Sequence, residues 1–265
     1  TLDGSHFNDT ILGGAGSDQI TGSGGADYIE GGDELDVWAG DQIQGGPGND
    51  TILGGVGRDG LDGNTGNDSV DGGDGDDSFN SSNGEGSDTL LGGAGNDSFT
   101  VWGYGSTPES VVINGGVGDD LIQTYLSEYG QRTLRATGGT GVDTYTFLSG
   151  GATRNYTITD FAAGTGGDRL DVSKLLDYSA SDGHGYEGGN PMSAAQGYLR
   201  LTQSGANTLL QYDENGAAGS TYTWHTAITL QNVTATAINA HNFKPLTIEG
   251  TAGADTLEGG LGVDT

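Results

Sequence analysis

The stretch from Gly45 to Asn80 reads GGPGNDTIL, GGVGRDGLD, GNTGNDSVD and GGDGDDSFN, which are four consecutive nine-residue units. Each unit begins with glycine, carries Asp at its sixth place and has an apolar residue at its eighth. The Asp and the apolar residue keep the nine-residue spacing together. This regularity indicates a structural repeat and excludes a merely acidic, glycine-rich linker.

The first six residues of each unit are suited to a tight turn, because glycine adopts positive φ at little steric cost. Such a turn points carbonyl oxygens toward its centre, and Asp50, Asp59, Asp68 and Asp77 add carboxylates at the same relative place. Nonapeptides of this form are a known calcium-binding repeat of parallel β-helices. Calcium takes roughly 6–8 oxygen ligands, more than one turn offers, so we expect stacked turns to share each ion.

The last three residues of each unit are suited to a short strand whose central apolar side chain points inward. If two units make one coil, Asp50 and Asp68 lie on one edge of the stack, and Asp59 and Asp77 on the other. Neighbouring parallel strands lie ~4.8 Å apart, so one ion can bridge two turns. The sequence therefore predicts an all-β fold, a parallel β-roll.

The array extends beyond this stretch over residues 1–150, and a truncated unit, GDQIQ, surrounds Asp41. Glu34 replaces an expected glycine, so we expect a distorted coil there. Two insertions, 101–113 and 124–136, interrupt the later units, whose Asp residues nevertheless stay 23 apart; this spacing indicates enlarged coils with surface loops. The further repeat Asp residues are Asp9, Asp18, Asp27, Asp36, Asp88, Asp97, Asp120 and Asp143.

The sequence pattern changes over residues 151–246. Segments in which apolar and polar residues alternate predict a small β-rich domain there that caps the roll. GYLRLTQ and NTLLQYD, separated by a Ser-Gly-Ala-Asn turn, predict a β-hairpin. Asp160, Asp168 and Asp171 either add a calcium site at the junction or are ordinary turn and strand-edge residues.

The nonapeptides restart over residues 247–265, with Asp255 and Asp264. This segment aligns without a gap to the opening of the chain, at an offset of 246. Either all such repeats resemble one another, or the chain is one module of a tandem array. Because both termini fall in repeat-like sequence, we expect them to be cuts through a longer protein.

The charge is strongly acidic, with 8 Lys and Arg against 37 Asp and Glu, a net charge of −29. Such self-repulsion opposes compaction unless cations bind, so metal binding energy becomes folding energy. Nucleic acid and anionic membranes are poor partners for this charge. There is no cysteine, no apolar run of about 18 residues that predicts a transmembrane helix, and no signal peptide at Thr1.

Catalytic motifs are missing from the sequence. None of the four histidines forms HExxH, and neither GxSxG nor a phosphate-binding glycine loop occurs. His184, near Asp182 and Glu187, is better interpreted as part of a flexible polar loop than as a metal ligand. We therefore predict no enzyme active site in this chain.

Four aromatic residues in the two insertions allow two interpretations. Trp102, Tyr104, Tyr125 and Tyr129 either bind carbohydrate or a partner, or pack over the roll or its cap. The sequence favours packing.

The array resembles the repeats-in-toxin (RTX) family of calcium-binding proteins, and GGTGVDTYTFLSG with ITDFAAGTGGDRLDVSKLL resembles the segment that follows the repeats in secreted members. The resemblance implies a right-handed parallel β-roll that binds several Ca²⁺ ions through the sixth-place Asp and through carbonyl oxygens of places two and four. The carbonyl ligands it implies are Gly14, Gly16, Gly25, Gly46, Gly48, Gly55, Gly57, Gly66, Gly73, Gly75, Gly86, Gly93, Gly95, Gly116, Gly118 and Gly141.

The resemblance also implies type I secretion from a Gram-negative bacterium and folding on meeting calcium outside the cell. Two uses then compete. The module either serves in an adhesin, surface layer or filament, with further copies of itself or adjoining domains as partners, or it is the folding and secretion module of a toxin or extracellular enzyme. The restart at 247–265 favours the first.

Overall fold

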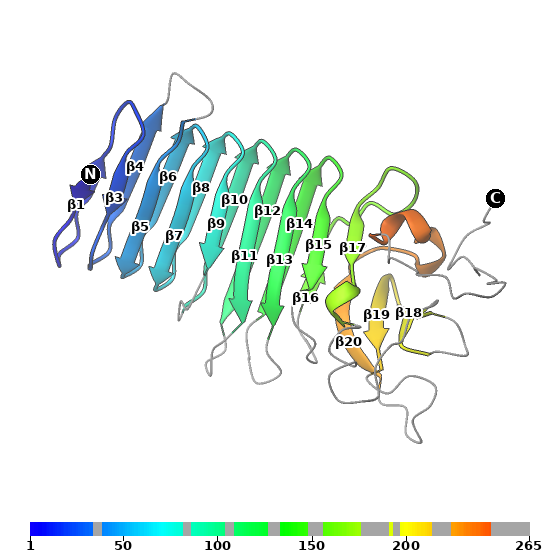
Figure 1. Cartoon of the computed structure of the whole chain (residues 1–265). Helices are drawn as coiled ribbons and strands as arrows, with labels where there is room; N and C mark the ends of the chain where they lie inside the picture. Colours follow the sequence, from blue (N-terminus) through cyan, green and yellow to red (C-terminus); the bar gives the residue numbers. More distant parts are fainter. Residues whose placement is uncertain are drawn as a thin grey trace, which may run out of the picture.

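The computed structural model describes residues 1–33, 39–81, 86–103, 109–126, 133–147, 156–175, 191–192, 197–213 and 224–244. The chain winds into a stack of coils whose strands form two parallel sheets, one on each side (Figure 1). As far as residue 171, successive strands alternate between the two sheets. The predicted parallel β-roll is confirmed.

The first sheet, called the odd sheet here, contains β1 (Leu2–Asp3), β3 (Gln19–Thr21), β5 (Gln42–Pro47), β7 (Gly60–Thr65), β9 (Ser78–Ser81), β11 (Ser98–Gly103), β13 (Leu121–Leu126), β15 (Thr144–Phe147) and β17 (Arg169–Asp171). The second, the even sheet, begins with β2 (Thr10–Leu12), β4 (Tyr28–Asp33), β6 (Thr51–Val56), β8 (Ser69–Asp74), β10 (Thr89–Ala94), β12 (Ser110–Val117), β14 (Thr133–Thr140) and β16 (Tyr156–Ile158). It is completed by β20 (His225–Leu230), β19 (Asn207–Tyr212) and β18 (Leu199–Ser204).

Two nonapeptides make one coil, as predicted. Ile52 pairs with Val70 in the even sheet and Leu61 pairs with Phe79 in the odd sheet, so a regular coil has eighteen residues. The eighth-place side chains point inward and are 0–4 % exposed from Ile20 to Phe99. Phe79 and Phe99 stack with ring centroids 4.5 Å apart. The core is thus a narrow apolar column between two sheets.

The described parts of the two predicted insertions are mostly strand rather than loop. β11 continues to Gly103, β12 begins at Ser110, β13 continues to Leu126 and β14 begins at Thr133. These longer strands have a physical reason, since Val101, Val111 and Leu134 supply extra inward apolar side chains at alternate positions. The enlarged coils are therefore wider versions of the same coil, with register steps of 23 residues.

The parallel sheets continue beyond residue 150, where the roll was expected to end. β16 pairs with β14 and β17 pairs with β15, both in parallel. The even sheet then turns antiparallel, because β18 and β19 form the predicted hairpin and β19 pairs with β20, which lies parallel to β16. The segment 151–246 thus begins as further coil and ends as a β-rich cap (Figure 1).

The cap is fixed to the last coil by Asn242 at the end of a short 3-10 helix, η3 (Ala240–Asn242), which follows η2 (Ala235–Ala237). The buried Asn242 side chain donates to the carbonyl oxygen of Asp168 at 2.8 Å and accepts from the N–H of Gly164 at 2.8 Å. Lys244 adds an ion pair with Asp171 at 2.9 Å. Within the described part of the chain, no helix is long and apolar enough to span a membrane.

Candidate calcium sites

The sixth-place Asp residues form one column along each edge of the roll. In each column the Oδ1 atom accepts a hydrogen bond from the backbone N–H of the equivalent Asp one coil earlier, as when Asp77 accepts from Asp59 at 2.8 Å. One column contains Asp9, Asp27, Asp50, Asp68 and Asp88. The other contains Asp18, Asp41, Asp59, Asp77, Asp97, Asp120, Asp143 and Asp168. The predicted distribution of Asp50, Asp59, Asp68 and Asp77 over two edges is confirmed.

The second carboxylate oxygen, Oδ2, is buried and has no hydrogen-bond partner at most of these positions. These residues are only 1–4 % exposed. A buried carboxylate oxygen with no donor is costly, and repeated burial of such oxygens requires a compensating charge. The residues concerned are Asp27, Asp50, Asp59, Asp68, Asp77, Asp97, Asp120 and Asp143.

A carbonyl oxygen of the next coil lies beside such an Oδ2 atom. A Cβ atom placed on Gly45 would lie 2.5 Å from Oδ2 of Asp50 and 2.8 Å from the carbonyl oxygen of Gly63. The same pairing recurs around Gly54, between Asp59 and Gly72. The edge of the roll thus brings carboxylate and carbonyl oxygens near each other, and calcium prefers oxygen ligands of both kinds. The residues present therefore fit calcium.

The glycines expected to supply carbonyl ligands all adopt positive φ, between 94° and 156°. A Cβ on Gly46 would clash with the carbonyl oxygen of Ser23, and one on Gly48 with that of Gly25. The carbonyls of the second and fourth places thus point along the stack toward the next turn. Asn64, which replaces a second-place glycine, also has positive φ, at 66°. The assignment of these carbonyls as ligands stays a prediction.

Burial raises the pKa of the column carboxyls, and neighbouring carboxylates add to the effect. The pKa rises to about 6 for Asp59 and Asp97, to about 7 for Asp68, Asp120 and Asp143, and to about 8 for Asp77. Backbone N–H donors to Oδ1 oppose this rise without cancelling it. Without a cation, the roll thus favours protonated columns, whereas a bound divalent ion favours the ionised form.

The short unit GDQIQ restores the column after Glu34. Asp41 accepts from the N–H of Asp18 and donates to Asp59, so it occupies the place expected for Asp36. The signal for Asp41 was present in the sequence, since Ile43 follows it at the usual distance of two. Several residues singled out from the sequence lie outside the described residues, namely Glu34, Asp36, Tyr104, Tyr129, Asp182, His184, Glu187, Asp255 and Asp264.

Two of the three junction carboxylates, Asp160 and Asp168, accept hydrogen bonds through both of their oxygens. Asp160 accepts from the N–H groups of Gly138 and Gly139 at 3.0 and 2.9 Å. Asp168 extends its column by accepting from Asp143, and its Oδ2 accepts from Ala162 at 2.8 Å. Their oxygens are therefore engaged in closing the last coil, unlike the partnerless oxygens earlier in the columns. The third junction residue, Asp171, accepts from the hydroxyl of Ser173 at 2.6 Å and pairs with Lys244. A calcium site formed by Asp160, Asp168 and Asp171 stays a prediction.

One column ends much earlier than the other. Thr89 pairs with Val112, so the place that follows Asp88 in the next coil is taken by Val111, and Leu134 and Tyr156 succeed it. All three are buried apolar or aromatic side chains. The wide coils therefore have carboxylates on one edge and an extended hydrophobic core on the other, which sequence spacing did not predict.

A second ladder, also missed from the sequence, lies just outside the columns at the fifth place of the turns. The side chain of Asn49 accepts from the N–H of Asn67, and that of Asn96 accepts from Asp119. In the same way, the side chain of Asp76 accepts from the N–H of Asn96. This ladder runs opposite to the Asp ladder, because here the earlier coil supplies the acceptor. The frequent Asn or Asp before the column Asp was its signal.

Within the described ranges, no three His, Asp or Glu side chains gather into a group that could hold a metal ion. The columns explain this, because each turn contributes one buried column carboxylate and successive column carboxylates are separated by a whole coil. A calcium site here must therefore take most of its ligands from main-chain carbonyls. Such a site is typical of a hard cation bound by stacked turns.

Comparison with known proteins agrees with this interpretation. The family described as RTX calcium-binding nonapeptide repeat (4 copies) matches residues 3–37, 38–69, 61–85, 82–100 and 247–265. No curated protein matches the chain. Among solved structures, the chain is similar to the solution structure of the AlgE6R3 subunit from the Azotobacter vinelandii mannuronan C5-epimerase, with 20% identity and a TM-score of 0.29. The match covers 77% of this chain and 94% of that one. Over residues 3–100 and 247–265, the chain consists of RTX calcium-binding nonapeptide repeats.

Proposed function

We propose that this chain is a calcium-dependent structural module of a secreted or cell-surface bacterial protein, and that it folds from an expanded acidic chain when calcium binds. The observation that carries the proposal is the set of buried Oδ2 atoms without hydrogen-bond partners in the two columns, at Asp27, Asp50, Asp59, Asp68, Asp77, Asp97, Asp120 and Asp143. These oxygens need a cation, and the glycine turns place carbonyl oxygens beside them.

The charge of the chain supports a disordered-to-ordered transition. A net charge of −29 opposes compaction, and the columns bring carboxylates together at each coil. Folding without calcium must either protonate these groups or tolerate their repulsion. A calcium-poor cytosol would thus keep the chain extended, and external calcium would fold it, as secretion of an unfolded chain requires.

Within this function, we favour a building block of an adhesin, surface layer or filament over a folding module for a distant toxin or enzyme domain. The support is the second match to the repeat family at residues 247–265, after the cap. A stack of coils is also rigid along its length, since neighbouring coils are tied together by two sheets and by Asp ladders, two of them as far as Asp88 and one beyond it. Further copies of the chain or adjoining domains are the partners of such a block.

Sedimentation velocity across a calcium titration, starting from chelated protein, tests the proposal. We expect an expanded monomer that compacts in calcium and not in magnesium, because magnesium demands octahedral geometry and retains its water. Growth into dimers or longer chains would support the assembly role, and a compact monomer would favour the folding-module role. A chain already compact in chelator would overturn both.

A further inference from the structure

The outer face of the odd sheet carries fewer charged side chains than the outer face of the even sheet. Outward positions alternate with the buried core positions along each strand. On β3, β5, β7 and β9 the outward side chains are Gln, Thr, Ser, Asn and one Asp, with Gly60 carrying none. The even sheet instead presents Glu30, Asp71 and Arg135, with the exposed apolar Leu12. In a chain with 37 acids, this nearly neutral amide and hydroxyl face is unusual.

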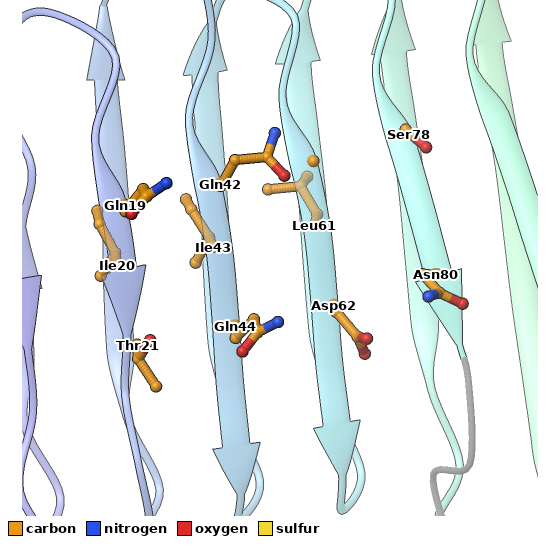
Figure 2. Close-up of a pocket in the computed structure, with 11 residues that line it drawn as sticks. Gln19, Ile20, Thr21, Gln42, Ile43, Gln44, Leu61, Asp62, Ser78 and Asn80 are labelled. Carbon is orange, nitrogen blue, oxygen red and sulfur yellow. The ribbon is translucent and has the colours of Figure 1, made fainter. Parts of the chain in front are cut away.

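This face also contains a hollow of about 510 Å³, which spans four neighbouring strands. Figure 2 shows side chains along it, with Gln19 and Gln42 on one level and Gln44, Asp62 and Asn80 on another. Register explains the levels, because Gln19 pairs with Gln42 and Gln44 pairs with Asp62. Gly60 interrupts the first level, and the amide of Gln42 lies over the space that a side chain at Gly60 would occupy.

The polar groups of this face can both donate and accept hydrogen bonds. Gln42 donates from Nε2 to the carbonyl oxygen of Asp41 at 3.0 Å, which orients its amide. Asp62 uses Oδ1 to accept from the N–H of Asn64 at 2.9 Å. An amide offers two donors and one acceptor oxygen, and a hydroxyl offers one donor and accepts as well. These donors and acceptors recur every ~4.8 Å from one strand to the next, and such rows suit a ligand rich in hydroxyl groups.

An aromatic pair extends the same face farther along the sheet. Trp102 on β11 and Tyr125 on β13 pair in register and stack with ring centroids 3.8 Å apart and planes at 1°. Both are half-buried. They lie on the outward side, one level beyond Thr100 and Gln123. Each ring covers one face of the other, so a sugar ring can pack only on an outer ring face or along the ring edges of this pair.

We propose that the outer face of the odd sheet, from β3 to β13, binds an uncharged polysaccharide chain. Hydroxyl groups of the sugars pair with the amide and hydroxyl levels in the hollow, and one ring packs on the Trp102–Tyr125 pair. The surrounding acids repel anionic polymers such as uronate chains, while calcium in the columns removes their repulsion only locally. This activity needs the folded roll, and it needs neither assembly nor secretion.

The test is binding of neutral hexasaccharides to the calcium-saturated chain by isothermal titration calorimetry. The probes are cellohexaose, laminarihexaose and maltohexaose, with hexaguluronate as the anionic comparison. We expect saturable binding of at least one neutral probe and at least tenfold weaker binding of hexaguluronate. Absence of binding by all three neutral probes at millimolar concentration, or tighter binding of hexaguluronate, would overturn the proposal.

Variants locate the site. The double substitution Gln44→Ala with Asn80→Ala removes exposed amides without touching the core, and we expect it to weaken binding at least tenfold. The matched control is Ser69→Ala, at an exposed outward position of the even sheet, which should leave affinity unchanged. Calcium-dependent compaction must be retained in both. Trp102→Ala should also weaken binding, whereas equal affinity in the double variant and the control would show that this face is not the site.

Discussion

Replacing Asp77 with Asn should have opposite effects with and without calcium. Asp77 is 2% exposed, its Oδ1 accepts from Asp59, and its Oδ2 has no hydrogen-bond partner. Asn keeps the shape and the Oδ1 acceptor but removes the charge. The substitution therefore separates the role of the side chain in packing from its role as a cation ligand.

Without calcium, the substitution should stabilise the roll. Burial raises the pKa of Asp77 from 3.8 to about 8, so the ionised group destabilises the folded state increasingly as the pH rises from 3.8 toward 8. One unit of pKa difference corresponds to about 1.4 kcal/mol, so ionised Asp77 lowers the stability of the calcium-free roll at pH 8 by at most about 6 kcal/mol. Solvent screening and coupling to neighbouring carboxylates reduce it to about 2–3 kcal/mol. We expect a gain of this size in chelator.

In saturating calcium, the sign should reverse. The loss of one ion held at a concentration about 100-fold above its dissociation constant costs about 2.7 kcal/mol of unfolding free energy. Urea unfolding followed by circular dichroism, in calcium and in chelator with a stabilising osmolyte, measures both effects. Asp76→Asn is the matched control, because it removes the same charge one residue away, where the group is half-exposed and accepts from Asn96. The control should change stability by no more than about 0.5 kcal/mol.

The reasoning would be refuted if Asp77→Asn and Asp76→Asn had equal effects in calcium. It would also fail if Asp77→Asn lowered stability in chelator as much as in calcium. The first result would mean that no ion depends on the column. The second would mean that the carboxylate is only a hydrogen-bonding part of the ladder.

Three further predictions concern the turns, the pH and the cap. Gly55 has φ 115°, and a Cβ added there would clash with the carbonyl oxygen of Gly32, so Gly55→Ala should lower the unfolding free energy in calcium by about 3 kcal/mol. Gly14 has φ 94° but faces open space, so Gly14→Ala should lower it by only about 1 kcal/mol. Urea unfolding measures both values. The calcium concentration at which half of the chain is folded should rise as the pH falls from about 8 to 6, because protons compete with calcium for carboxyl groups whose pKa values are about 6 to 8. A calcium titration followed by circular dichroism measures this midpoint, and a midpoint that did not change with pH would contradict the prediction. Asn242→Ala breaks buried hydrogen bonds to Gly164 and Asp168, so it should lower the unfolding free energy by about 2–3 kcal/mol and speed amide hydrogen exchange in the last coil. Unchanged hydrogen exchange in that coil would show that the cap does not stabilise it.

The local repeat determined most of the roll. A turn needs glycine and a strand needs one inward apolar residue. Because the repeat is nine residues long and two repeats make one coil, every regular coil has two turns and two strands. The nine-residue spacing therefore places Ile52, Leu61 and Phe79 in the core, and Asp50 and Asp59 on opposite edges. These features are short-range, so they can be predicted from the amino-acid sequence. The spacing of 23 residues likewise predicted enlarged coils.

Only the tertiary structure decided the features that depend on pairing between distant segments. The register of β12 against β10 replaces the next column Asp with Val111, and no local pattern shows that shift. The partnerless state of Oδ2 is also a property of stacking, since the neighbouring coil fills Oδ1 and leaves the other oxygen buried. Asn242 reaches Asp168 across 74 residues of chain. The sequence determined what each coil contains, while the stacking of coils, through burial and hydrogen bonds between turns, decided which carboxylate oxygens are buried without a hydrogen-bond partner.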